Sequence, residues 1–234
     1  MQIIPIAGKG SRFRSAGYTT AKYLLPVLGK PIIEHILSYF DKTKPTLLIL
    51  NEQDSNKKKV ERILKALNYE DFQVVEIADT NGQLTSVVNG IMNSKFSDYD
   101  GPVWIYNGDT IRKKELPYSL FTNNSAEAFI EVFIELGDHW SFVDSLGVVS
   151  RITEKDRISN FCCTGLYGFK SLSRIINYMN ARKVVKLKNE LYVSGVFQNY
   201  LDDSLGVWAF DSDRSDFLLC GTPEEYDLVI KMEN

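Results

Sequence analysis

Residues 2–13 read QIIPIAGKGSRF, and this stretch decides the fold class. The apolar run from Gln2 to Ile6 predicts a buried strand, and Gly8 and Gly10 directly after it predict a tight loop. Glycine tolerates positive φ and lets backbone N–H groups approach a phosphate closely. Ligands of open α/β sheets bind at the carboxyl ends of the strands, which is where this loop falls. The stretch therefore indicates an α/β sheet with a glycine loop at its edge, where a phosphate is one candidate ligand.

The loop departs from two common phosphate-binding motifs. Phe13 stands where the dinucleotide-binding fingerprint requires its third glycine. The Walker motif is also absent, because no Gly-Lys-Ser or Gly-Lys-Thr follows at the required spacing. A short Gly-x-Gly loop alone leaves a plain strand-to-helix turn as an equal alternative, so other segments must decide.

Beyond this loop, short apolar runs alternate with helical patterns as far as Tyr106. Such an alternation predicts a doubly wound, mostly parallel sheet with helices on both faces and right-handed crossovers. The predicted elements are the strands Gln2–Ile6, Thr46–Leu50, Phe72–Ile77 and Val103–Tyr106 and the helices Pro31–Phe40, Asp54–Leu67 and Leu84–Met92.

The second half of the chain is richer in strands and contains a small β-rich insertion. Four strands are predicted in succession at Ala126–Glu135, Trp140–Asp144, Gly147–Ile152 and Cys162–Phe169. Helices at Leu172–Met179, Glu190–Leu201 and Pro223–Met232 and short strands at Val207–Phe210 and Phe217–Leu219 complete the prediction. Because no Gly/Ser-rich or charge-rich linker divides the chain, we expect residues 1–234 to form a single domain.

Composition narrows the class of protein and its partners. The 234 residues are 44% hydrophobic and 24% charged, which are ordinary globular values. A net charge of −3 argues against nucleic acid as the main partner. No apolar run approaches the roughly 18 residues that span a bilayer, and no signal peptide is predicted. Three cysteines, Cys162, Cys163 and Cys220, lack metal-site or disulfide spacing, so a cytoplasmic location is expected.

A lysine lies among apolar residues in the segment AKYLLPVLGKP, residues 21–31. Gly29 and Pro31 restrain the backbone here, and a cation such as Lys22 is suited to a fixed phosphate. The alternative is a lysine that is simply solvated at the surface.

An aspartate follows the fourth predicted strand in the sequence Asn107-Gly108-Asp109-Thr110. A carboxylate at the carboxyl end of a strand is well placed to hold Mg²⁺ that is bound to phosphates. The alternative is a turn aspartate, because Asn-Gly-Asp is also common in turns.

Taken together, these segments resemble the sugar-phosphate nucleotidyltransferase family in their order and spacing. The resemblance rests on the glycine loop with Arg12, on Lys22 with the following Gly29-Lys30-Pro31, and on Gly108-Asp109. Later matches are Glu154-Lys155, the segment from Thr164 to Phe169, and the segment from Gly221 to Tyr226. The match extends over nearly the whole chain and is most specific in residues 1–110.

The resemblance implies a Rossmann-like, GT-A-type fold, with a nucleotide-binding half (1–110) and an acceptor-binding half (111–234). It implies catalytic roles for Arg12, Lys22 and Asp109, with Asp109 also the ligand of a Mg²⁺ cofactor. It further implies that Ala7, Gly8, Gly10, Ser11 and Arg12 hold the triphosphate, that Gly82 and Gln83 contact the nucleobase, and that Lys155, Thr164, Gly165 and Glu190 meet the acceptor.

The sequence departs from the family pattern at two positions. Leu219 stands where members often carry a second metal carboxylate. Three alternatives follow: Asp109 holds the metal together with phosphates and water, another carboxylate takes the place of the missing one, or the activity is reduced. The candidate substitutes are Asp211, Asp213 and Asp216. Gly195 stands where an acidic residue is expected, and this puts the usual sugar contacts in doubt.

The implied activity is a Mg²⁺-dependent nucleotidyl transfer from a nucleoside triphosphate, with a pyrimidine base favoured, to a sugar 1-phosphate or related precursor of a surface polysaccharide. Two alternatives remain open. One is cytidylyl transfer to a non-sugar phosphate, such as a phosphorylated amino acid amide or amino alcohol. The other is a nucleotide-binding module with little turnover. The expected partners are the nucleotide and a phosphorylated small molecule, without nucleic acid or membrane; the oligomeric state stays open, with a homodimer as one possible assembly.

Overall fold

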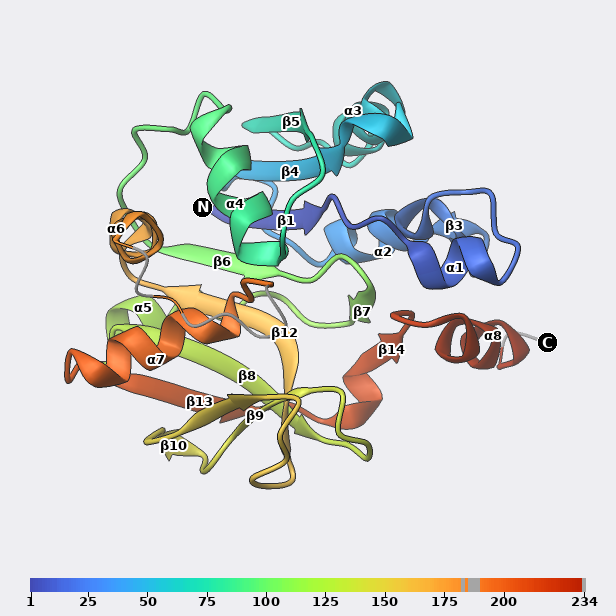
Figure 1. Cartoon of the computed structure of the whole chain (residues 1–234). Helices are drawn as coiled ribbons and strands as arrows, with labels where there is room; N and C mark the ends of the chain where they lie inside the picture. The colour runs from blue at the N-terminus through green and yellow to red at the C-terminus, as the bar shows by residue number, and fades with distance from the viewer. Residues whose placement is uncertain (182–183, 185–189, 233–234) are drawn as a thin grey trace.

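The computed structural model describes residues 1–181, 184 and 190–232 (Figure 1). Its strands are β1 (Gln2–Ile6), β2 (Pro26–Val27), β3 (Lys30–Pro31), β4 (Thr46–Asn51), β5 (Phe72–Ile77), β6 (Val103–Tyr106), β7 (Thr110–Arg112), β8 (Ala128–Ile134), β9 (Ser141–Val143), β10 (Gly147–Val148), β11 (Ile152–Glu154), β12 (Phe161–Phe169), β13 (Val207–Asp211) and β14 (Phe217–Leu219). Its α-helices are α1 (Ser11–Ser15), α2 (Ile32–Ser38), α3 (Lys57–Ala66), α4 (Gln83–Met92), α5 (Leu120–Asn123), α6 (Leu172–Asn180), α7 (Ser194–Asp202) and α8 (Pro223–Lys231). Short 3₁₀ helices are η1 (Lys22–Leu24), η2 (Glu52–Asp54) and η3 (Arg214–Asp216).

One large sheet runs through both halves of the chain, in the strand order β10-β13-β8-β12-β6-β1-β4-β5. Strands β6, β1, β4 and β5 are parallel neighbours, and β13 is parallel to β8. Strand β12 lies antiparallel to both β6 and β8 and joins the two parallel parts (Figure 1). The predicted α/β class with a mostly parallel central sheet is therefore confirmed.

Helices cover both faces of this sheet, as the apolar pattern predicts. Consecutive strand residues point to opposite faces, and Ile3 and Ile4 are both fully buried in two different apolar clusters. One cluster includes α4, α6 and α7, and the other includes α2, α3 and α8. None of the helices in the described part of the chain has the length and apolar content to cross a bilayer.

Three predicted elements differ from the structure by more than two residues or by a break, and the others agree within two residues. The predicted helix Asp54–Leu67 begins only at Lys57, because Glu52–Asp54 form η2 and Ser55 is left-handed with a φ of +51°. The predicted strand Gly147–Ile152 is divided into β10 and β11, because the Ser150 amide donates to the Asp144 carboxylate (3.1 Å) instead of a neighbouring strand. The predicted helix Glu190–Leu201 begins only at Ser194. The Leu191 backbone is already bonded to the loop before α4, so it cannot form the first helical turn.

Candidate functional site

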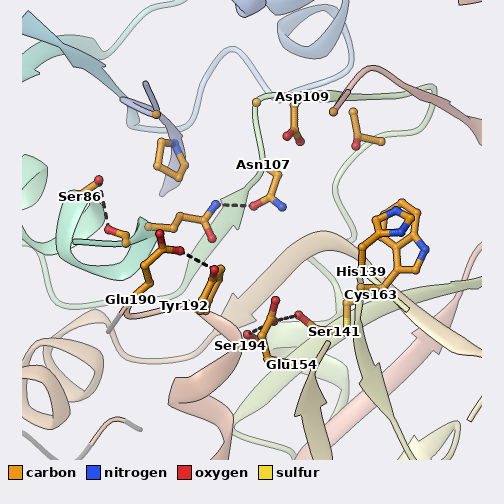
Figure 2. Close-up of a pocket in the computed structure, with 18 of the residues that line it drawn as sticks. Ser86, Asn107, Asp109, His139, Ser141, Glu154, Cys163, Glu190, Tyr192 and Ser194 are labelled. Atoms are coloured by element: carbon orange, nitrogen blue, oxygen red, sulfur yellow. Dashed lines mark hydrogen bonds between the residues drawn. The ribbon is translucent and has the colours of Figure 1, made fainter. Parts of the chain in front are cut away.

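A cavity of about 550 Å³ opens at the carboxyl ends of the parallel strands (Figure 2). The loops that follow β1, β5 and β6 form one side of it, and the strand-rich second half forms the other. This is the edge at which open α/β sheets bind their ligands. Cavity and sheet edge therefore coincide where the sequence predicts a phosphate-binding loop.

The glycine loop after β1 forms one wall of the cavity. Gly10 has a φ of +61° and directly precedes α1, a one-turn helix where the sequence predicts only loop. A side chain at Gly8 or Gly10 would meet no atom within 4 Å, so the loop backbone faces open space. Ser11 and Arg12 follow in α1, are exposed and also line the cavity.

Lys22 and Asp109 face each other although 87 positions separate them in the chain. The Lys22 ammonium donates to Asp109 Oδ2 at 2.8 Å, and both side chains are partly exposed, at 24% and 31%. Gly108, next to Asp109, lies close against β1, because a Cβ there would lie 1.9 Å from Ile6 Cγ2. In this pairing the Lys22 ammonium neutralises the Asp109 carboxylate at the edge of the cavity.

Gly82 and Gln83 lie at the start of α4 on another wall of the cavity. Gly82 has a φ of +108°, and a Cβ there would lie 2.4 Å from the Leu191 amide nitrogen, so glycine is required. The Gln83 amide donates to Asn107 Oδ1 across the end of β6 (Figure 2). This contact joins the loop after β5 to the loop that carries Asp109.

The second half supplies two hydrogen-bonded groups to the cavity. Glu154 accepts from the hydroxyls of Ser141 and Ser194, the latter at 2.8 Å. The Lys155 ammonium donates to the Tyr192 hydroxyl at 2.9 Å, and that hydroxyl donates to Glu190 (Figure 2).

Two other predicted acceptor residues have structural partners. Thr164 is buried at the cavity wall, and its hydroxyl donates at 2.9 Å to Glu131, which is itself paired with buried Arg112. Gly165 is not among the described lining residues of the cavity. Its backbone carbonyl accepts a hydrogen bond from the backbone N–H of Asn107 at 3.0 Å. Gly165 therefore supports the loop behind the cavity.

The predicted site residues nevertheless converge on one region. Those that line the cavity are Ala7, Gly8, Gly10, Ser11, Arg12, Gly82, Gln83, Asp109, Lys155, Thr164 and Glu190. Lys22 lines an adjoining cavity of about 560 Å³ that shares the residues Gly8, Lys9 and Gly10 with the first.

Several lining residues were not selected from the sequence. His139 and Trp140, expected in a turn and a strand, stack with ring centroids 4.3 Å apart and line the cavity with Ser141, Tyr192 and Ser194. Their ordinary local patterns carry no functional signal. Glu154 belongs to the Glu154-Lys155 segment that resembles the family, but the sequence analysis names only Lys155 as a residue that meets the acceptor.

The donor set at Asp109 fits a weakly held Mg²⁺. Within residues 1–181, 184 and 190–232, no group of three or more His, Cys, Asp or Glu side chains is arranged to hold a metal. Mg²⁺ bound with substrate phosphates commonly uses only one or two carboxylates and keeps several waters. Asp109 at the cavity wall meets that requirement.

The proposed substitutes for the second metal carboxylate lie elsewhere. Asp213 caps η3, where it accepts from the Ser215 amide at 2.8 Å, and Asp216 pairs with Lys114. Neither of these residues nor Asp211 is among the described lining residues of the cavity. The substitution hypothesis therefore has no support at these three positions.

Leu219→Asp is expected to destabilise the fold rather than to repair the metal site. Leu219 lines the cavity, but it is only 8% exposed and packs in a cluster with Phe133, Phe142 and Phe217. Burying a carboxylate there should cost about 2–3 kcal/mol of unfolding free energy, which a thermal melt can detect. Leu228→Asp, at a leucine that is 61% exposed, is the control and should melt near the native temperature. An unchanged melt with a tighter Mg²⁺ requirement would contradict this assignment.

A family model described as nucleotidyl transferase matches residues 1–216. A nucleoside-diphosphate-sugar pyrophosphorylase from Vibrio cholerae superposes with a TM-score of 0.90 and 28% identity, over 99% of this chain and 100% of that one. The chain is thus similar to this enzyme along its whole length.

More distant structures share the fold. A putative glucose-1-phosphate thymidylyltransferase from Bacillus anthracis gives a TM-score of 0.77 at 20% identity, over 99% of this chain and 94% of that one. The inositol-1-phosphate CTP transferase from T. maritima gives 0.74 at 15% identity, over 100% and 96%. Among curated proteins, the bifunctional protein GlmU of Enterococcus faecalis is 49% identical over 47 residues, which span 20% of this chain and only 10% of that relative.

Proposed function

The chain belongs to the nucleotidyl transferase family, and from that premise we propose that it transfers a nucleotidyl group from a nucleoside triphosphate to a phosphorylated small molecule, with release of pyrophosphate. One observation carries this proposal. The glycine loop, the Lys22–Asp109 pair and the Lys155 side of the second half surround two adjoining cavities at one sheet edge. A triphosphate on the loop and an acceptor near Lys155 would meet between these groups.

In the proposed reaction, an oxygen of the acceptor phosphate attacks the α-phosphorus in line, and the bond to pyrophosphate breaks. A phosphate monoester is largely ionised at neutral pH, so no general base is required. Arg12 and Lys22 bind the phosphates and neutralise their charge, which makes catalysis a matter of positioning and electrostatics. Mg²⁺ held by Asp109 and the phosphates would add positive charge at the same place.

Finer assignments follow the family resemblance. The proposed nucleotide carries a pyrimidine, and the proposed acceptor is a sugar 1-phosphate or related precursor of a surface polysaccharide. A cytoplasmic location, a single domain in two halves and a homodimer remain predictions. Arg12, Lys22 and Asp109 are the proposed catalytic residues.

A second candidate is cytidylyl transfer to a non-sugar phosphate. Two features favour it: Gly195 lies in the first turn of α7 without a side chain, and one oxygen of Glu154 is already engaged by two serine hydroxyls. Fewer carboxylate oxygens are then free to bind the several hydroxyls of a sugar.

Product analysis separates these candidates. CTP, UTP, dTTP, GTP and ATP would each be incubated with Mg²⁺ and glucose 1-phosphate, inositol 1-phosphate or phosphoethanolamine, and the product masses measured. A nucleotide-linked sugar with a pyrimidine base supports the first candidate, and a CDP-linked amino alcohol supports the second. Binding of nucleotide without any product would support a binding module instead.

A further inference from the structure

A short segment, residues 190–194, lies between the two halves of the cavity. It ends at the first residue of α7 and contacts the nucleotide side through Leu191 and the acceptor side through Tyr192 and Ser194. We call residues 190–194 the bridging segment.

On the nucleotide side, backbone hydrogen bonds attach the bridging segment to the loop before α4 and to the first turn of that helix. The Leu191 amide donates to the Asn81 carbonyl at 3.1 Å, and the Leu84 amide donates to the Leu191 carbonyl at 2.9 Å. Gly82 lies directly beneath, with no room for a Cβ against the Leu191 backbone. The position of this segment is therefore fixed by the loop that carries Gly82 and Gln83.

On the acceptor side, the aromatic residue of the bridging segment holds a lysine. Lys155 Nζ lies 2.9 Å from the Tyr192 hydroxyl and 4.7 Å from the centre of its ring. The Tyr192 hydroxyl in turn donates a hydrogen bond to the Glu190 carboxylate. Burial, and then the hydrogen bond to Glu190, raise the pKa of Tyr192, so the hydroxyl stays protonated and keeps both roles at neutral pH.

The backbone of Lys155 also indicates a constrained role. Its φ is +57°, a left-handed conformation that is uncommon for lysine, and its amide donates to the Trp140 carbonyl at 2.8 Å. A long, flexible lysine side chain loses its orientation unless something fixes its end. Tyr192 supplies that fixed point within the cavity.

We propose that Tyr192 is a positioning residue that holds the Lys155 ammonium towards the acceptor and ties its place to the nucleotide-side loop. The inference rests on the proposed function, because it takes Lys155 as the residue that meets the acceptor phosphate. Removal of the hydroxyl takes away the hydrogen bond that orients the lysine, without removing the charge of the lysine. The defect should therefore appear in acceptor use and not in nucleotide use.

Tyr192→Phe tests this role, because it removes the hydrogen bond and keeps the ring. We expect the KM for the acceptor to rise about 10-fold, the size of one lost hydrogen bond to a charged group, with the KM for the nucleotide changed less than about 2-fold. The probe is whichever of glucose 1-phosphate, inositol 1-phosphate or phosphoethanolamine supports pyrophosphate release. Tyr178→Phe is the matched control. The Tyr178 hydroxyl donates to the Asp203 carboxylate at 2.6 Å, and neither residue is among the described lining residues of the cavity.

A double-mutant cycle with Lys155→Ala shows whether Tyr192 acts through the lysine. If it does, Tyr192→Phe has no further effect on acceptor KM in the Lys155→Ala background. The inference would be overturned by additive effects of the two substitutions, by an unchanged acceptor KM in Tyr192→Phe, or by equal rises in the KM for acceptor and nucleotide. In each of these cases, activity of the wild-type protein leaves the proposed function intact. A wild-type protein that releases no pyrophosphate with any acceptor removes the proposed function and this inference with it.

Discussion

Asp109→Asn is expected to lower acceptor-dependent pyrophosphate release by about 10³-fold, the upper range for the loss of one electrostatic contact at a reacting centre. The variant keeps the shape of the side chain but loses the charge that is proposed to hold Mg²⁺ and that faces Lys22 at 2.8 Å. Raising the Mg²⁺ concentration should not restore the rate, because an amide is a much poorer ligand than a carboxylate. The rate is measured by coupled pyrophosphate detection across a Mg²⁺ titration.

The same variant should remain folded. Asp109 is 31% exposed on a loop, and a partly exposed ion pair contributes only about 0–1 kcal/mol to stability. Its backbone carbonyl, which accepts from the Cys220 amide at 3.0 Å, is unaffected by the change. Asp71→Asn is the matched control, because it breaks another aspartate–lysine pair, with Lys95 at 2.6 Å, on the exposed surface. A near-native rate for Asp109→Asn would show that the metal assignment is wrong.

Lys22→Ala is expected to reduce kcat by about 10²–10³-fold with a smaller change in the KM for the nucleotide. The ammonium lies beside Asp109 at the proposed reacting centre, so its charge should matter most when charge moves in the transition state. Arg12, exposed on α1, should by contrast affect mainly triphosphate binding when changed to alanine. Steady-state kinetics with both substrates varied separate the two effects.

The matched control for this lysine is Lys95→Ala, which also loses an aspartate partner but lies on the surface. The Arg12→Ala, Lys22→Ala double variant should be non-additive, because both side chains act on one polyanion. If both single variants alter only the KM for the acceptor, the triphosphate assignment of the glycine loop is contradicted.

The nucleotide-side framework could be predicted because its signals are local. The run Gln2–Ile6 and the glycines after it specify a buried strand and a loop from adjacent residues, and the structure has both. Alternation of short strands and helices then specifies the parallel part of the sheet. The family assignment, confirmed by the match over residues 1–216, added the order of the later segments.

What the sequence could not supply are the contacts between distant segments. Nothing local to Lys22 indicates that its partner is Asp109, and nothing in Tyr192 indicates Lys155. The helix predicted from Glu190 was too long because the Leu191 backbone bonds across to Asn81 and Leu84. Helical periodicity reports which side chains face the core, but not which backbone groups are already bonded elsewhere.

The measurement that tests the central claim most directly is acceptor-dependent pyrophosphate release by the wild-type protein at saturating Mg²⁺. It would be run with five nucleoside triphosphates against sugar 1-phosphates, inositol 1-phosphate and phosphorylated amino alcohols. Nucleotidyl transfer predicts pyrophosphate release that requires both a nucleotide and an acceptor and that equals the amount of nucleotide-linked product. Asp109→Asn should lower this release by about 10³-fold. A protein that binds a nucleotide yet releases no pyrophosphate with any acceptor would contradict nucleotidyl transfer.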